Sequence, residues 1–407
     1  MAPSTDKGPP LRLLEIALDR GMITEAQLEM IRAEHTQVAA QGRSKTPTRI
    51  AIERGILSDQ DAHELETEAW IRELPSDLEE YHLVRLVGRG GMAVVFEAQD
   101  ISLGKTVAVK LLLPEFSSSD SYLARFHREA RIAARLTHPN TVQVFRAGEK
   151  EAVQFLVMEF IEGEPISAIL RRRGRIPERD ALDVAFQVSG ALEEAAGLGI
   201  IHRDVKPGNI LMSRWGVPKL ADFGIAKEFA DIRDARIQQS LTMGVVGTPT
   251  YMSPEQARGA RDLDFRSDIY SLGATLYHMA VGDLPFPAST PQETMVRVVA
   301  ESPRLPRDAF PQLSESASAV ICKMMAKHAA DRYASYPELK ADLAAAREGK
   351  PTSINYAEAC RLMTPAARPE EIRAPAAVGR LLRTLAVAGA VAAVGLALLL
   401  LMMRGCN

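Results

Sequence analysis

The sequence predicts an α+β chain with a small all-α module, a larger unit that begins in β-strands, and one C-terminal membrane-spanning helix. Two copies of a helix–glycine–helix pattern in residues 1–74 predict the all-α module. Apolar residues alternate on both sides of a glycine-rich turn after Tyr81, which predicts that the larger unit opens in strands. Nineteen residues without a charge, 385–403, predict the spanning helix.

Length and composition narrow the class of protein. A chain of 407 residues exceeds one ordinary core and predicts two or three units. The net charge of −3 gives no argument for a nucleic-acid partner, so we predict none. Cys322, Cys360 and Cys406 lie far apart without a C-x-x-C pair, so we expect neither a disulfide framework nor a zinc site. The first residues lack the apolar segment of a secretory signal.

The all-α module is predicted from LEIALDRGMITEAQLEMI and TRIAIERGILSDQDAHEL, which match at a shift of 34 residues. In each copy a glycine, Gly21 or Gly55, ends one helix. Thr24 or Ser58 then caps the next helix, and Gln27 completes a capping-box pattern after Thr24. The pattern resembles the paired helical repeats at the N-termini of type II secretion and pilus ATPases, some of which bind cyclic dinucleotides. We nevertheless interpret this segment as a docking or autoregulatory helical module, and binding of a cyclic dinucleotide is the alternative.

The larger unit opens with YHLVRLVGRGGMAVVFEAQD, which predicts a strand, a glycine-rich turn and a strand. A dinucleotide-binding fingerprint would require a helix after the glycines. Glycines at 88, 90 and 91 let backbone N–H groups approach phosphates. A second apolar strand ends in Lys110, and a helix over 126–136 follows, with Glu129 as its one acidic residue.

The stretch GIIHRDVKPGNILMSRWGVPKLADFG, residues 199–224, carries the chemistry. Two short strands joined by a glycine-containing turn would bring Asn209 beside Asp222. An amide and a carboxylate are the hard oxygen donors that magnesium takes when phosphates supply other ligands. Asp204 then remains to orient a hydroxyl nucleophile.

These residues resemble the protein kinase family, specifically the bacterial Hanks-type serine/threonine kinases, because H-R-D-x-x-x-x-N and D-F-G both match. Lys206, two residues after Asp204, is the form typical of Ser/Thr rather than Tyr kinases. The resemblance implies a two-lobed kinase fold over 81–347, with ATP and Mg²⁺ as cofactors and protein Ser/Thr hydroxyls as substrates.

The resemblance also implies roles for individual residues. Asp204 and Lys206 would serve transfer with Lys110, Glu129 would hold Lys110 against the phosphates, and Asn209 and Asp222 would bind the metal. The nucleotide would be contacted by Val87, Gly88, Arg89, Gly90, Gly91, Val95, Ala108, Lys110, Met158, Glu159, Ile161 and Leu211. Ala93 replaces the family's third glycine, which makes the loop tip stiffer.

The loop after D-F-G is expected to control activity. Its end, GTPTYMSPE, resembles a substrate-docking segment in which Thr248 bridges Asp204 and Lys206. Ser240 and Thr242 are the predicted activating phosphosites, since a phosphate there would pair with the arginine before Asp204. The resemblance further implies that Asp268 braces the catalytic loop and that Arg332 is the buried partner of Glu255.

The C-terminal part predicts attachment to a membrane. Residues 348–384 are Pro-, Ala- and Arg-rich and predict a flexible linker, with one short helix around Tyr356–Met363. A buried soluble helix is the alternative to a span at 385–403, although it would rarely run so long without a polar face. Three arginines precede the apolar stretch and one follows, which predicts a cytoplasmic kinase domain at the inner membrane.

Small-residue spacings at Ala388 and Gly389 would allow a homodimer within the lipid bilayer. Only residues 405–407 lie beyond Arg404, so no extracellular sensor is expected.

The predicted function is therefore ATP-dependent phosphorylation of protein Ser/Thr in bacterial signal transduction. One alternative is a nucleotide-binding pseudokinase scaffold that signals through its helical module. Such scaffolds tend to lose Lys110, Asp204 or Asp222, and all three are present. A second alternative, a small-molecule kinase of the same fold, is disfavoured by the GTPTYMSPE segment.

Overall fold

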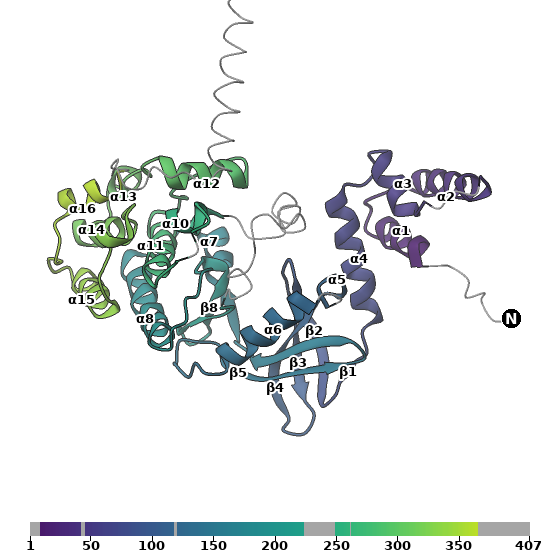
Figure 1. Cartoon of the computed structure of the whole chain (residues 1–407), viewed down its shortest axis with the longest axis horizontal. Coiled ribbons are helices and arrows are strands. Elements are labelled where there is room, and N and C mark those ends of the chain that lie inside the picture. The colour runs from purple at the N-terminus through teal and green to yellow at the C-terminus, as the bar shows by residue number, and fades with distance from the viewer. Residues whose placement is uncertain (1–8, 42–44, 118–119, 224–248, 261, 365–407) are drawn as a thin grey trace, which may run out of the picture. The chain divides into compact units, whose positions relative to one another are not determined.

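The computed structural model describes residues 9–41, 45–117, 120–223, 249–260 and 262–364 (Figure 1). Within these ranges the chain forms two compact units. The first unit comprises residues 9–120 with 147–157, and the second comprises 121–146 with 158–364.

The first unit begins with four helices: α1 Pro9–Asp19, α2 Glu25–Ala40, α3 Pro47–Glu53 and α4 Asp59–Glu73. Gly21 and Gly55 adopt φ of +67° and +66°, the left-handed conformation that ends a helix without steric cost in glycine. The predicted capping box at Thr24 is confirmed, and Ser58 forms the equivalent box at the start of α4. Apolar side chains from all four helices form a common core.

A six-stranded sheet follows, with the order β1-β2-β3-β4-β6-β5. Its strands are β1 Asp77–Leu78, β2 Tyr81–Arg89, β3 Ala93–Asp100, β4 Lys105–Leu112, β5 Val144–Lys150 and β6 Val153–Glu159. β2 and β3 form the predicted hairpin around the glycine-rich turn. Alternate residues of β3, Val94, Phe96 and Ala98, are buried in the core beneath the sheet, as the period-two pattern requires. The short helix α5, Pro114–Ser117, continues from β4.

The second unit is mainly helical. Its helices are α6 Asp120–Ala133, α7 Ile166–Arg173, α8 Glu178–Gly197, α10 Pro254–Ala257, α11 Arg266–Val281, α12 Pro291–Ala300, α13 Pro306–Ala309, α14 Glu315–Met324, α15 Tyr336–Arg347 and α16 Tyr356–Leu362. A three-stranded sheet, β7 Gly163–Pro165, β8 Ile210–Ser213 and β9 Pro218–Leu220, lies among them. The helix predicted over 126–136 therefore begins six residues earlier and ends three earlier, as α6.

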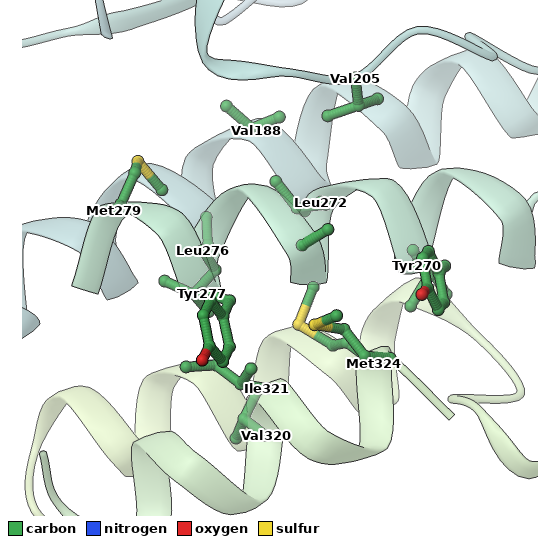
Figure 2. Close-up of a cluster of buried hydrophobic side chains, with 14 of the residues drawn as sticks. Val188, Val205, Tyr270, Leu272, Leu276, Tyr277, Met279, Val320, Ile321 and Met324 are labelled. Atoms are coloured by element: carbon green, nitrogen blue, oxygen red, sulfur yellow. The ribbon is translucent and has the colours of Figure 1, made fainter. Parts of the chain in front are cut away.

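α11 forms the centre of this unit. Every one of its residues from Ser267 to Tyr277 is buried, and a helix that is apolar on all faces belongs in a core. Figure 2 shows α11 side chains packed beside those of α14, with Tyr277 near Ile321. Gly273 permits this approach, since a Cβ at that position would lie 2.6 Å from the Met324 Cβ.

The chain remains packed beyond the boundary predicted near Arg347. Ala359 and Met363, on and just after α16, are fully buried in the core of the second unit. Lys327 donates its backbone N–H to the Leu362 carbonyl at 3.0 Å. Residues 350–363 are therefore part of the folded unit, and the predicted linker can begin only after them. The short helix expected there is present as α16.

Two further predictions concern the cysteines and the membrane-spanning helix. Cys322 and Cys360 are free thiols, although folding brings their sulfurs to 4.0 Å. Among the described residues, no helix has the length and apolarity to cross a membrane. The predicted span at 385–403 lies outside those residues.

Candidate active site

The loop from His202 to Asn209 is hydrogen-bonded to one buried carboxylate, that of Asp268, which is 2% exposed. The N–H of His202 donates to Asp268 Oδ2 at 2.7 Å, and the N–H of Arg203 donates to Oδ1 at 2.8 Å. This is the bracing contact that the resemblance implied. Burial raises the pKa of Asp268 to about 7, against the two N–H donors, which lower it.

Asp204 lies at the centre of a small polar cluster. Lys206 Nζ donates to Asp204 Oδ2 at 2.8 Å, and both side chains are mostly buried. The Asn209 amide donates to the same Oδ2 at 3.1 Å and to the Asp204 backbone carbonyl at 2.9 Å. Three of the predicted site residues are thus brought together. The lysine charge and the amide fix the orientation of the carboxylate.

A hairpin places Asp222 beside this cluster. Ile210 of β8 pairs with Leu220 of β9, and Gly216 makes the turn between the strands with φ of +77°. At the open end, the Ala221 N–H donates to the Asn209 carbonyl at 2.8 Å. The predicted strand–turn–strand arrangement is confirmed. Asp222 directly follows Ala221, whose N–H is bonded to Asn209.

The glycine-rich loop belongs to the first unit. Gly88 pairs with Val95 across the β2–β3 hairpin, and the Gly90 N–H donates to the Ala93 carbonyl at 2.8 Å. The register shifts between Leu86 and Gly88, so Val87 lies at an irregularity, and this residue is 40% exposed. Arg89 ends β2.

Two further predicted residues lie on the neighbouring strand of that sheet. Lys110 of β4 pairs with Val95 of β3, so the two predicted nucleotide contacts are cross-strand neighbours. Ala108, two residues earlier on β4, is buried. The sheet therefore brings the lysine beside the strand that follows the glycine-rich turn.

The strand predicted to contact adenine has a contact that the sequence did not indicate. Lys219 of β9 donates from Nζ to both carboxylate oxygens of Glu159, at 2.8 and 2.9 Å. Glu159 also accepts the Gln143 N–H at 3.2 Å. A lysine in a short strand reads as a solvated residue, and 60 residues separate the pair, so no local pattern could have revealed it. Met158 is buried, while Ile161 and Leu211 are partly exposed.

The described end of the docking segment is anchored to the helical core. Ser253 caps α10 and forms a capping box with Gln256. Tyr251 and His278 are joined by a 2.7 Å hydrogen bond between Oη and Nδ1. Glu255 and Arg332 form the predicted buried pair, through two bonds of 2.6 and 2.8 Å.

Other predicted residues have no described environment. Glu129 lies on α6, as expected from its position in the sequence. Thr248, Ser240 and Thr242 lie outside the described residues.

The model of the protein kinase domain family matches residues 81–342. A probable serine/threonine-protein kinase PknB of Bifidobacterium longum is 40% identical over 272 residues, which is 65% of this chain and 39% of that protein. Serine/threonine-protein kinase PknB of Mycobacterium leprae is 38% identical over 292 residues, 71% of this chain and 45% of that protein. This chain thus spans less than half of each relative's length.

A solved structure is similar over the same part. The PknI kinase domain of Mycobacterium tuberculosis is 27% identical, with a TM-score of 0.54. The match covers 68% of this chain and 99% of that domain. The similarity therefore concerns a nearly complete domain.

Proposed function

This chain belongs to the protein kinase domain family, and we propose that it transfers the γ-phosphoryl group of ATP to Ser and Thr hydroxyls of proteins. The observation that carries the proposal is the cluster in which Lys206 and Asn209 both contact Asp204 Oδ2. The names of the relatives, all serine/threonine-protein kinases, support the choice of acceptor.

Asp204 acts on the acceptor. Its carboxylate accepts a hydrogen bond from the substrate hydroxyl, orients the oxygen for attack and takes the proton. Lys206, at 2.8 Å, places a positive charge next to that carboxylate and offsets negative charge on the phosphoryl group in transit. Few groups are needed, because phosphoryl transfer depends mainly on positioning and on charge stabilisation.

Asn209 and Asp222 fit a magnesium ion. The β8–β9 pairing and the backbone bond from residue 221 to Asn209 support this assignment, since an amide and a carboxylate are hard oxygen donors that suit an ion that also takes phosphate oxygens. When bound, magnesium neutralises charge on the phosphates. Asn209 serves two purposes, since its Nδ2 also orients Asp204.

The first unit supplies the proposed contacts with the phosphates. Backbone N–H groups of Gly88–Gly91 would approach the phosphates, and Lys110 would add a positive charge from the adjacent strand pair. The finer assignments, adenine contacts at Met158, Glu159 and Ile161 and the support of Lys110 by Glu129, rest on the resemblance alone.

The test uses the purified full chain with labelled ATP, magnesium and a generic basic protein. Asp204→Asn and Asp222→Asn should each lower the rate by more than about 100-fold, because they remove the proton acceptor and a metal ligand. Asp262→Asn, at an exposed carboxylate of the same unit, is the matched control and should leave the rate unchanged. Circular dichroism verifies that the three variants fold alike. Full activity of Asp204→Asn would exclude the role assigned to Asp204, whereas an inactive wild-type chain would favour the scaffold function.

Activation through Ser240 and Thr242 is the second part of the proposal. A phosphate at these positions would carry about two negative charges toward Arg203, the residue next to Asp204. The double change to Ala should lower the transfer rate and leave the affinity for ATP nearly unaltered. Mass spectrometry of the active protein tests it: phosphate found only elsewhere, with full activity of the double variant, would contradict it.

We further propose that residues 385–403 anchor the chain in the inner membrane, with the kinase domain cytoplasmic and able to pair with a second copy. Tethering raises the effective concentration of one copy near another. Truncation after Pro369 should release the protein from the membrane fraction and slow autophosphorylation at low concentration. Equal initial rates for the truncated protein in buffer and the full chain in vesicles, at matched bulk concentration, would remove pairing from the proposal.

A further inference from the structure

The two helical repeats are joined by a reciprocal pair of ion pairs. Arg20 and Arg54 occupy equivalent positions at the 34-residue shift, and so do Glu34 and Glu68. Arg20 Nε lies 3.3 Å from Glu68 Oε2, and Arg54 Nε donates to Glu34 Oε2 at 2.9 Å. Each arginine therefore contacts the glutamate of the other repeat. Because the two ion pairs are equivalent, a variant of one pair can serve as the control for a variant of the other.

The symmetry is broken at Glu68. Arg89 Nη2, at the end of β2 in the glycine-rich loop, lies 3.9 Å from Glu68 Oε2. Arg72 Nη2 donates to the other carboxylate oxygen at 2.8 Å. Glu68 is also the more buried of the two glutamates, since its side chain is 13% exposed while that of Glu34 is 26% exposed. Burial and closeness to several cations strengthen a charge contact.

α4 is fixed to the β-sheet at the same place. Trp70, Ile71 and Leu74, at the end of α4 and just after it, pack against the apolar core beneath the sheet. α4 leads into β1, which pairs with β2 (Figure 1). At the other end of the helix, His63 Nδ1 lies 3.3 Å from Glu115 Oε1 on α5. The helix that carries Glu68 is therefore held along its length and can transmit a restraint.

The loop that Glu68 reaches has much backbone freedom of its own. Glycine at 88, 90 and 91 leaves four consecutive positions with one side chain, that of Arg89. Arg89 is the side chain through which the helical module can hold this stretch. A loop restrained before the nucleotide binds loses less conformational entropy when it binds.

We propose that Glu68 is a positioning residue, through which the helical module restrains the glycine-rich loop by its contact with Arg89 and so strengthens nucleotide binding. This inference rests on the proposed kinase function. It also gives the repeat module a regulatory role in the chain. Arg20 and Arg89 share Glu68 Oε2, so a change at the repeat interface alters the hold on the loop.

The experiment compares Glu68→Gln with Glu34→Gln in the full chain. Each variant loses one inter-repeat ion pair of the same kind. Glu68→Gln also loses the pair with Arg72, which lies within α4, and the contact with the loop through Arg89. We expect Glu68→Gln to raise KM for ATP, and Kd for a fluorescent ATP analogue, about two- to fivefold with kcat unchanged, the range of one partly exposed ion pair. Glu34→Gln should leave both constants at the wild-type value. In an Arg89→Gln background, Glu68→Gln should have no additional effect.

Hydrogen–deuterium exchange without nucleotide provides a readout that does not depend on catalysis. Amides of residues 86–94 should exchange faster in Glu68→Gln and at the wild-type rate in Glu34→Gln. Unchanged exchange in Glu68→Gln, or an equal change in both variants, would overturn the inference. An inactive wild-type protein with the predicted exchange difference would instead contradict the kinase proposal and keep the restraint.

Discussion

Replacing Glu255 by Gln tests how a buried ion pair stabilises the helical unit. The Arg332 side chain is fully buried and donates from Nη1 and Nη2 to the two Glu255 oxygens. The Ser267 hydroxyl donates to Oε1 at 2.6 Å. Burial would raise the pKa of Glu255, but the hydrogen bonds and charge of Arg332, with Ser267, outweigh it and lower the pKa to about 2.

The magnitude follows from this pKa. A fall from 4.5 to about 2 corresponds to roughly 3 kcal/mol in favour of the folded carboxylate. Glu255→Gln also leaves the Arg332 guanidinium buried without a counter-charge, and breaking a buried pair in this way costs about 3–5 kcal/mol. We therefore expect the free energy of unfolding to fall by roughly 3–5 kcal/mol at pH 7.

The assay is guanidinium chloride unfolding followed by far-UV circular dichroism. Because the folded pKa of Glu255 lies below its unfolded value, the carboxylate stabilises the fold above pH 4.5, and that contribution is lost as the pH falls toward 2. Between pH 4.5 and 2, the free energy of unfolding should therefore fall less in Glu255→Gln than in the wild type. Glu193→Gln is the control, since Glu193 pairs with Lys340 at 2.9 Å on the surface and should cost less than about 1 kcal/mol. Equal losses for the two variants would refute the reasoning.

Two further predictions concern the second unit. Asp268→Asn should weaken the catalytic loop by about 1–3 kcal/mol, because an amide can accept only one of the N–H groups of His202 and Arg203; unchanged hydrogen exchange of the 200–209 amides would contradict this. Burial lowers the pKa of His278, so the unfolded chain binds its proton more tightly and the free energy of unfolding should fall as the pH drops below 6.5. Tyr251→Phe removes the 2.7 Å bond to this ring and should cost about 1 kcal/mol in thermal unfolding, and an unchanged midpoint would count against the bond.

Local pattern was sufficient for those parts of the site that are close in the chain. Asn209 and Asp222 flank two short apolar runs and a glycine, and the hairpin follows from that order. The contact between Glu159 and Lys219 depends on how distant strands are packed, which no spacing records. The composition of residues 348–363 indicated a linker, yet Ala359 and Met363 are buried because their burial is decided by the neighbouring surface of α14. The repeat predicted equivalent positions for Arg20 and Arg54 but not that each contacts the other copy.

No pattern in the sequence predicts the backbone conformations of Arg203 and Asp222, and His202 makes contacts close to both. Arg203 and Asp222 adopt φ of +65° and +55°, although non-glycine residues in this region cost roughly 1–3 kcal/mol each. His202, fully buried, contacts the neighbours of both: its N–H bonds Asp268, its Nε2 lies 3.1 Å from the Ala221 carbonyl, and its ring lies 4.6 Å from that of Phe223.

The tautomer of this histidine follows from its partners. Nδ1 accepts the Asp204 N–H at 3.2 Å, while a carbonyl can only accept from Nε2, so the neutral Nε2–H form satisfies both bonds. In that form His202 joins the loop of Asp204 to the strand end of Asp222. The strain at the two positions is thus balanced by bonds of a histidine that takes no part in the proposed transfer, and the Asp204 carboxylate that does take part is oriented by Lys206 and Asn209 before any substrate binds.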